Sequence, residues 1–172
     1  MLVPGPAPLE YEIVELFTQF RNPLLRYVSA LGLPIADGEE VVQEVFLALF
    51  QHLRQGKPRT NLKGSVFRVG HNLALKQRMR NGRREKLYGS DVANSEHLAP
   101  EPNPEQLFAG SRRREKLLAV IKELPETDRC CLYLRAEGLR YRQIADVLDI
   151  SLGGVSEMLG RTLARLSKVE EY

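Results

Sequence analysis

The stretch YRQIADVLDISLGGVSEMLGRTLARL, residues 141–166, decides the expected fold of the second half of the chain. It predicts a helix from Tyr141 to Leu148, a short turn, and a second helix from Leu152 to about Lys168. Ala145 is small enough for two helices to approach closely, and Ser151 is a favourable N-cap. The residues expected to form the shared core are Ile144, Leu148, Ile150, Val155 and Leu159. The pattern favours a helix-turn-helix over an ordinary helical hairpin.

The apolar spacing elsewhere is also helical, and no period-2 strand pattern accompanies it. Before the helix-turn-helix, one helix is predicted from about Ser111 to Leu124 and another from Glu126 to Ala136. Residues 87–110 contain three prolines and no basic residue, and they predict a flexible linker. We therefore expect an all-α protein whose two small helical domains, residues 1–86 and 111–172, are joined by this linker.

Three helices are expected in the first domain. The first spans about Glu10 to Leu31, and Pro23 should kink it or restart it with Asn22 as the cap. The second begins at Asp37, which has capping-box spacing to Glu40. The third runs from about Leu62 to Arg84.

The positive charge of the chain is concentrated in one segment. The net charge is only +3, but residues 57–86 contain 10 basic and 1 acidic residue, a local charge of +9. On the third helix, one face is expected to carry Arg68, Asn72, Lys76, Arg80 and Arg83. An ordinary solvated helix mixes both signs of charge, so this face predicts a surface that binds a polyanion.

Several functional classes have no support in the sequence. The longest purely apolar run, residues 45–50, has six residues, far short of a membrane span. Residues 1–8 lack the basic and apolar regions of a secretory signal, so we expect a cytoplasmic protein. Cys130 and Cys131 are adjacent and lack the spacing of zinc ligands, and they fit two buried or half-buried side chains better than a redox switch. No catalytic constellation or phosphate-binding glycine loop is evident, and we expect neither an enzyme nor a cofactor or metal.

Three motifs together resemble the extracytoplasmic-function sigma factors of bacterial RNA polymerase. Asp37 to Phe46 is similar to the polymerase-binding helix of that family, and Leu62 to Leu75 resembles its promoter-melting helix. Leu124-Pro125-Glu126, Leu134 to Leu139 and the helix-turn-helix resemble its C-terminal domain. The resemblance covers nearly the whole chain outside the linker and the extreme N-terminus.

This resemblance implies an alternative sigma factor that directs the polymerase to specific promoters and aids promoter melting. Residues 1–86 would be a region 2-like domain, whose polymerase-binding residues would be Asp37, Glu40, Gln43, Glu44, Phe46 and Leu47. The residues that would bind the −10 element are Arg59, Asn61, Lys63, Arg68, Asn72, Lys76, Arg80 and Arg83. Residues 111–172 would be a region 4-like domain that binds the −35 element through Arg142, Gly153, Ser156, Glu157, Arg161 and Arg165. The implied partners are core RNA polymerase, promoter DNA and an anti-sigma factor, without direct insertion into a membrane.

The chain departs from the family pattern at several positions. Ser65 stands where the family usually has an aromatic residue, and His71 where it commonly has an arginine. In the second helix of the helix-turn-helix, Ser156 and Met158 stand where basic residues are usual, and Glu157 adds an acid. These changes predict an unusual or weak −35 preference, with Glu157 as a candidate for selecting cytosine. A sigma-like interaction module, or a helix-turn-helix regulator without initiation activity, is the alternative.

Overall fold

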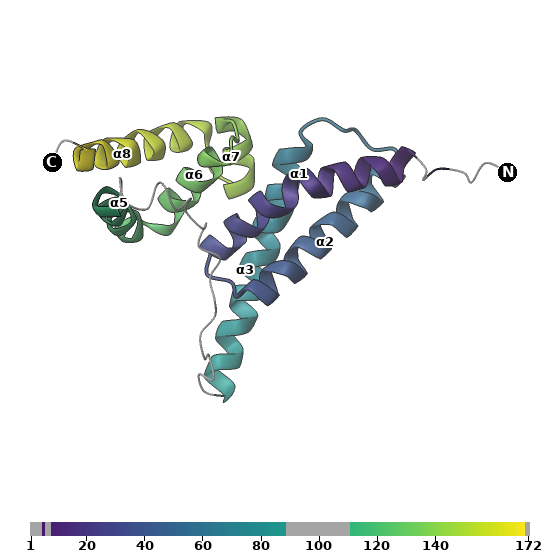
Figure 1. Cartoon of the computed structure of the whole chain (residues 1–172), viewed down its shortest axis with the longest axis horizontal. Helices are drawn as coiled ribbons and strands as arrows, with labels where there is room; N and C mark the ends of the chain where they lie inside the picture. The colour runs from purple at the N-terminus through teal and green to yellow at the C-terminus, as the bar shows by residue number, and fades with distance from the viewer. Residues whose placement is uncertain (1–4, 6–7, 89–110, 171–172) are drawn as a thin grey trace. The chain divides into compact units, whose positions relative to one another are not determined.

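The computed structural model describes Gly5 and residues 8–88 and 111–170, and within these residues it contains helices and no strand. The chain divides into two compact units, one within residues 1–98 and the other within 99–172. The all-α prediction is therefore confirmed for the described residues (Figure 1). Most of the predicted linker lies outside them, but Leu87 still belongs to the third helix, because the helical pattern continues past Arg84 to Tyr88.

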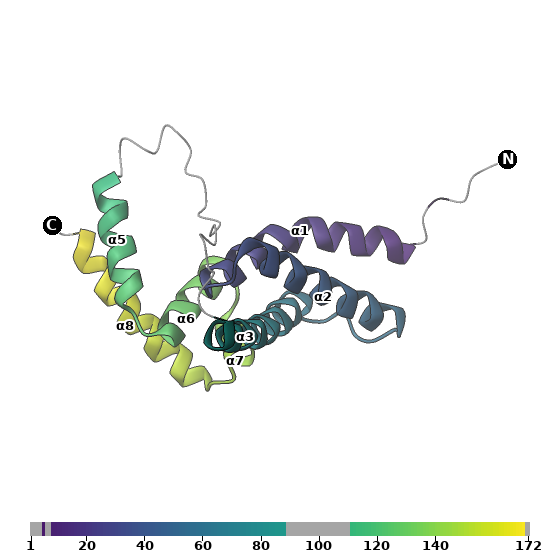
Figure 2. The same ribbon diagram turned by 90° about the horizontal axis from the view of Figure 1, so that it is seen from below.

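In the first unit, α1 (Pro8–Ala30), α2 (Ile35–Arg54) and α3 (Leu62–Tyr88) pack pairwise against one another. Figure 2 shows α3 seen nearly along its axis, with α1 and α2 running beside it. Leu24 and Val28 of α1, Val42 of α2 and Phe67 of α3 are almost completely buried and form the centre of this unit. The three helices therefore share one apolar core.

Two details of the helix boundaries differ from the sequence expectation. α1 continues through Pro23 without a restart at Asn22. The proline removes the N–H partner of the Gln19 carbonyl, and Gln19 is exposed, so water can hydrate that oxygen. The predicted capping box at Asp37 is wrong, because α2 begins at Ile35 after Pro34 and has no side-chain cap. Asp37 instead lies in the first turn.

Polar contacts join α3 to the first turn of α2 and to the turn that follows α1. The Asn81 Nδ2 atom donates a hydrogen bond to Asp37 Oδ2 at 2.8 Å, and Arg78 Nη1 donates to the Leu31 carbonyl at 3.1 Å. Deeper in the unit, the Tyr27 hydroxyl lies 2.8 Å from His71 Nδ1, and the two rings stack. His71 is therefore a buried core residue that is hydrogen-bonded within the protein.

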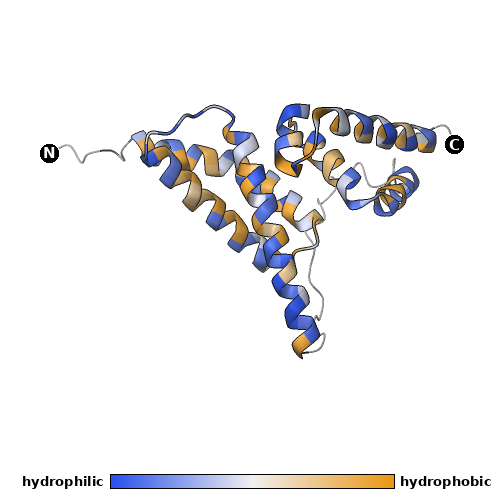
Figure 3. Ribbon diagram, turned by 180° about the vertical axis from the view of Figure 1, so that it is seen from behind, coloured by the Kyte–Doolittle hydropathy of each residue, from blue (hydrophilic) through white to orange (hydrophobic). Residues whose placement is uncertain are grey.

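The second unit contains α5 (Ser111–Glu123), α6 (Glu126–Ala136), α7 (Tyr141–Leu148) and α8 (Leu152–Glu170). α8 packs against the other three helices, and Figure 3 shows hydrophobic and hydrophilic residues alternating along it. Ile144, Val155 and Leu159 are fully buried, whereas Leu148 and Ile150 are half-buried. The predicted core of the helix-turn-helix is thus formed mainly by three of its five residues.

Candidate nucleic-acid interfaces

The basic face of α3 is exposed to solvent along its whole length. Its members, which the sequence predicted to share one face, are all exposed: Arg68, Asn72, Lys76, Arg80 and Arg83. Val66 and Phe67 are buried on the opposite side, which orients the helix. Figure 3 shows the hydrophilic character of the C-terminal half of α3, whose last turns extend past the core. This arrangement presents a row of cations at helical spacing that can follow a phosphate backbone.

A cavity of ≈ 460 Å³ lies between α2 and α3, at the N-terminal end of this basic face. Val45, Leu49 and Val66 form apolar parts of its wall. The polar residues that line it are Gln51, His52, Gln55, Lys57, Ser65, Arg68 and Asn72. Arg68 and Asn72 therefore belong to both the basic face and the cavity. Sequence reasoning missed this cavity, since its two walls come from different helices.

Ser65, where the family usually has an aromatic side chain, lines the cavity. Serine occupies much less volume than an aromatic residue, so this departure leaves the space open and adds a hydroxyl group to its wall. The cavity therefore combines apolar walls with several hydrogen-bonding groups, which suits a flat, partly polar ligand.

The loop between α2 and α3 is held to α1 by an ion pair. Arg59 Nε and Nη2 donate to the two carboxylate oxygens of Glu12 at 2.6 and 2.9 Å. The hydrogen bond from Arg59 lowers the pKa of the Glu12 carboxyl, and the same contact raises the pKa of Arg59. Asn61 adopts a left-handed backbone (φ 58°), and its side chain occupies the space that a Cβ at position 64 would need. Because Gly64 has no Cβ, the Asn61 side chain can pack against the first turn of α3. Lys63 in the same turn is half-buried.

The predicted polymerase-binding residues of α2 fall into two groups. Glu40, Gln43 and Glu44 are exposed, and Leu47 is 59% exposed. Phe46 instead lies in the core, where its ring meets that of Phe17 edge-on at 5.0 Å between centroids. Asp37 is half-buried, and its carboxylate accepts a hydrogen bond from Asn81 of α3.

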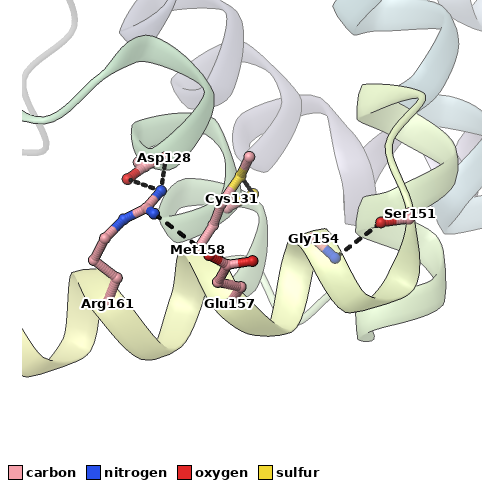
Figure 4. A network of polar contacts seen from close by, with 7 residues as sticks. All are labelled: Asp128, Cys131, Ser151, Gly154, Glu157, Met158 and Arg161. Atoms are coloured by element: carbon pink, nitrogen blue, oxygen red, sulfur yellow. Dashed lines mark hydrogen bonds and ion pairs between the residues drawn. The ribbon is translucent and has the colours of Figure 1, made fainter.

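The turn of the helix-turn-helix has well-defined local geometry. Asp149 ends α7 in the left-handed conformation (φ 54°, ψ 49°), and the Ile150 N–H donates to the Ala145 carbonyl at 3.1 Å. The Ser151 hydroxyl accepts a hydrogen bond from the Gly154 N–H at 3.0 Å, which confirms the predicted N-cap (Figure 4). At the start of α7, Gln143 Oε1 accepts a hydrogen bond from the Arg140 N–H at 2.8 Å.

All six residues predicted to read the −35 element are exposed: Arg142, Gly153, Ser156, Glu157, Arg161 and Arg165. Arg161 differs from the other five because its guanidinium also contacts a side chain of another helix in the same unit. Arg161 Nη2 lies 3.1 and 3.3 Å from the carboxylate oxygens of Asp128, a buried residue of α6 (Figure 4). Leu152, 46% exposed at the first position of α8, is a surface residue that the sequence reasoning did not single out.

Both cysteines are buried, as the sequence favoured. Burial raises the pKa of the Cys131 thiol to about 11, so the reactive thiolate is scarce near neutral pH. The Cys131 Sγ atom lies 3.8 Å from the Met158 sulfur in the core between α6 and α8. Among the described residues, no group of His, Cys, Asp and Glu side chains is placed to hold a metal ion. No described helix has the length and apolar character of a bilayer span.

Comparison with known proteins gives consistent matches. Residues 114–166 match the model of sigma-70 region 4. The ECF RNA polymerase sigma factor SigE of Mycolicibacterium smegmatis is 32% identical over 149 residues, which are 86% of this chain and 57% of that protein. The ECF RNA polymerase sigma-E factor of Escherichia coli is 28% identical over 153 residues, 85% of this chain and 80% of that protein. The chain thus spans little more than half the length of the first relative.

Two solved structures share the fold. The structure of CnrH in complex with the cytosolic domain of CnrY matches with a TM-score of 0.61 and 21% identity, covering 94% of this chain and 89% of that chain. The sigma factor RpoE of Bartonella quintana, in complex with the anti-sigma factor NepR, matches with a TM-score of 0.64 and 20% identity, covering 91% and 97%. With a match to region 4 in its second unit and sequence similarity across both units, the chain is similar to the extracytoplasmic-function sigma factors.

Proposed function

We propose that this chain is an alternative sigma factor that binds core RNA polymerase in the cytoplasm, directs it to specific promoters and catalyses no reaction itself. The observation that carries the proposal is the exposed basic face of α3, which leads directly to the cavity between α2 and α3. In this proposal residues 1–86 bind the polymerase and the −10 element, and residues 111–172 bind the −35 element.

The chemistry of the first unit suits unpaired DNA better than a closed duplex. The cations of α3 can neutralise successive phosphates, a contribution that is independent of sequence. A base that has left the stack can enter a cavity with apolar walls and polar groups at its edge. Asn72 and Arg68 line this cavity and offer hydrogen-bond donors to a base edge. Holding such a base would stabilise the melted state of the promoter.

The exposed face of α2 supplies the proposed polymerase contact. Leu47 is 59% exposed and lies one helical turn from Gln43, with Gln51 one turn further on. A single exposed leucine flanked by amide side chains fits an interface with a small apolar centre and a polar rim. An anti-sigma factor is a further proposed partner. The complexes of RpoE with NepR and of CnrH with CnrY support it, because their sigma-fold chains resemble this one.

The test is transcription by purified core polymerase from a template whose −10 region is already melted. We expect RNA synthesis that depends on the chain, and a strong reduction when Arg68 and Arg80 are both changed to alanine. The matched control is the double change of Arg112 and Lys122 to alanine, which removes the same charge from exposed positions of α5.

The outcomes separate the candidate functions. RNA that depends on the chain and is reduced only by the α3 variant supports the sigma factor. Binding to polymerase without RNA on any melted template would favour an interaction module without initiation activity. The engagement of Arg161 by Asp128 gives that alternative some weight, because it removes one cation from the DNA-binding helix. No binding to polymerase at all would refute the proposal.

A further inference from the structure

The outward face of α8 carries few functional groups. Val155 and Leu159 are buried, so the opposite side of the first two turns faces solvent. Gly153 and Gly160 are on that side, and a Cβ at either position would meet no atom within 4 Å. Ser156 and Glu157 are therefore the polar side chains that this face offers between residues 152 and 160, and Glu157 is 77% exposed.

The nearest cation on the same helix is already engaged. Arg161 donates through Nη2 to both carboxylate oxygens of the buried Asp128, while its Nη1 atom lies 3.9 Å from Glu157 Oε1 (Figure 4). Asp128 belongs to the first turn of α6, so the guanidinium is anchored from another helix. Arg161 thus stands between a buried carboxylate and an exposed one, and it can orient Glu157 without reaching out to DNA itself.

A carboxylate on this face can read only certain bases. An ionised glutamate accepts hydrogen bonds and donates none, so it needs a donor on the base edge. In the major groove, guanine presents two acceptors and thymine an acceptor and a methyl group, and both disfavour a carboxylate. Adenine presents an amine next to the N7 acceptor, whereas cytosine presents its N4 amine. Cytosine is therefore the best match.

We propose that Glu157 is the specificity-determining residue of the helix-turn-helix, selecting cytosine at one position of the upstream promoter element, with Arg161 as its positioning residue. This inference rests on the proposed sigma function and gives the chemistry of its upstream contact. The glycines at positions 153 and 160 remove side chains that would hold the helix away from the groove. Leu152, 46% exposed at the start of α8, can contact an adjacent thymine methyl group.

The experiment uses the full chain with core polymerase and a library of templates. Each template has a melted −10 region and a randomised duplex upstream, and the sequences that yield RNA are counted. The native chain should enrich cytosine at one upstream position by about tenfold over the other bases. Glu157→Gln should shift the preference at that position towards adenine, because glutamine both donates to N7 and accepts from the adenine amine. Glu157→Ala should flatten it.

Two further variants isolate the roles. Arg161→Ala should weaken the cytosine preference while leaving the preferred base the same, as expected of a positioning residue. Glu115→Ala, which removes one exposed acid from α5, is the control for net charge and should leave the profile unchanged. An unchanged profile in Glu157→Ala, or RNA synthesis without any upstream preference, would overturn the inference and leave the proposed function standing. Absence of RNA on all templates would defeat both.

Discussion

Replacing Arg161 by alanine tests whether this residue stabilises the second unit or serves mainly as a DNA contact. The Asp128 side chain is 5% exposed, whereas Arg161 is 52% exposed. Without Arg161, the Asp128 carboxylate would keep its burial but lose two charge-assisted hydrogen bonds. We therefore expect Arg161→Ala to destabilise the second unit.

The magnitude follows from the burial of the two partners. Removing one member of a fully buried ion pair costs about 3–5 kcal/mol. The guanidinium here is half exposed, so the lost arginine leaves a site that water can partly reach. A cost of about 1–3 kcal/mol is expected in consequence, the range for an unsatisfied buried polar group. The same loss should be much smaller in an Asp128→Asn background, because an amide carries no charge that needs a partner.

Amide hydrogen exchange read by mass spectrometry localises this effect. Peptides from α6 and α8 should exchange about 5- to 150-fold faster in Arg161→Ala, the ratio equivalent to that free energy. Peptides from α1, α2 and α3 should be unchanged and serve as an internal control. Arg165→Ala, at an exposed position of the same helix, is the matched variant and should have little effect. Equal exchange in the two arginine variants would refute the structural role of Arg161.

Three further predictions concern other parts of the chain. Glu12→Gln should release Arg59 from its ion pair, so that Arg59 adds one phosphate contact to single-stranded DNA at neutral pH. The slope of the logarithm of the binding constant against the logarithm of the salt concentration should then become steeper by about 0.7. In the folded protein, Cys131 should react with iodoacetamide at pH 8 at least about a hundredfold more slowly than in urea, because a thiol with a pKa of about 11 is almost wholly protonated there. Gly70→Ala should destabilise the first unit by about 1–3 kcal/mol in urea unfolding, because the new Cβ would lie 2.6 Å from a core leucine. Gly82→Ala, whose Cβ would meet open space, should instead stabilise the unit by up to about 1 kcal/mol.

Each of these has a distinct contrary result. An unchanged salt slope in Glu12→Gln would mean that Arg59 does not become available to DNA. Equal alkylation of Cys131 in the folded and unfolded chains would show that the buried position does not protect the thiol. Equal stability of the two glycine variants would mean that the core around position 70 adjusts without cost.

The sequence was most informative where a structural feature depends on near neighbours along the chain. Helical periodicity depends on residues three and four apart, so the positions of α7 and α8 and the exposed row from Arg68 to Arg83 followed from it. The Ser151 cap was likewise predictable, because its partner is only three residues away. The family resemblance was also accessible from the sequence, because it depends on three motifs and on their order along the chain.

The features that the sequence did not reveal are contacts between residues far apart along the chain. Asp37 had suitable spacing for a capping box, yet Asn81, 44 residues later, hydrogen-bonds to its carboxylate. Phe46, predicted to contact the polymerase, is buried in the first unit and packs against Phe17, 29 residues earlier. Arg161, predicted to bind DNA, also hydrogen-bonds to Asp128, which lies 33 residues earlier in the chain.

By itself, then, the sequence determined the helices, the helix-turn-helix and the concentration of positive charge on α3, because these depend on local spacing and composition. Only the tertiary structure decided which polar and charged side chains remain available to a partner. It also revealed the cavity, whose walls include Val45 and Leu49 of α2 and Val66 and Asn72 of α3. The physical reason is that ion pairs, burial and cavities depend on which helix faces pack together. Such packing brings residues into contact whatever their separation along the chain.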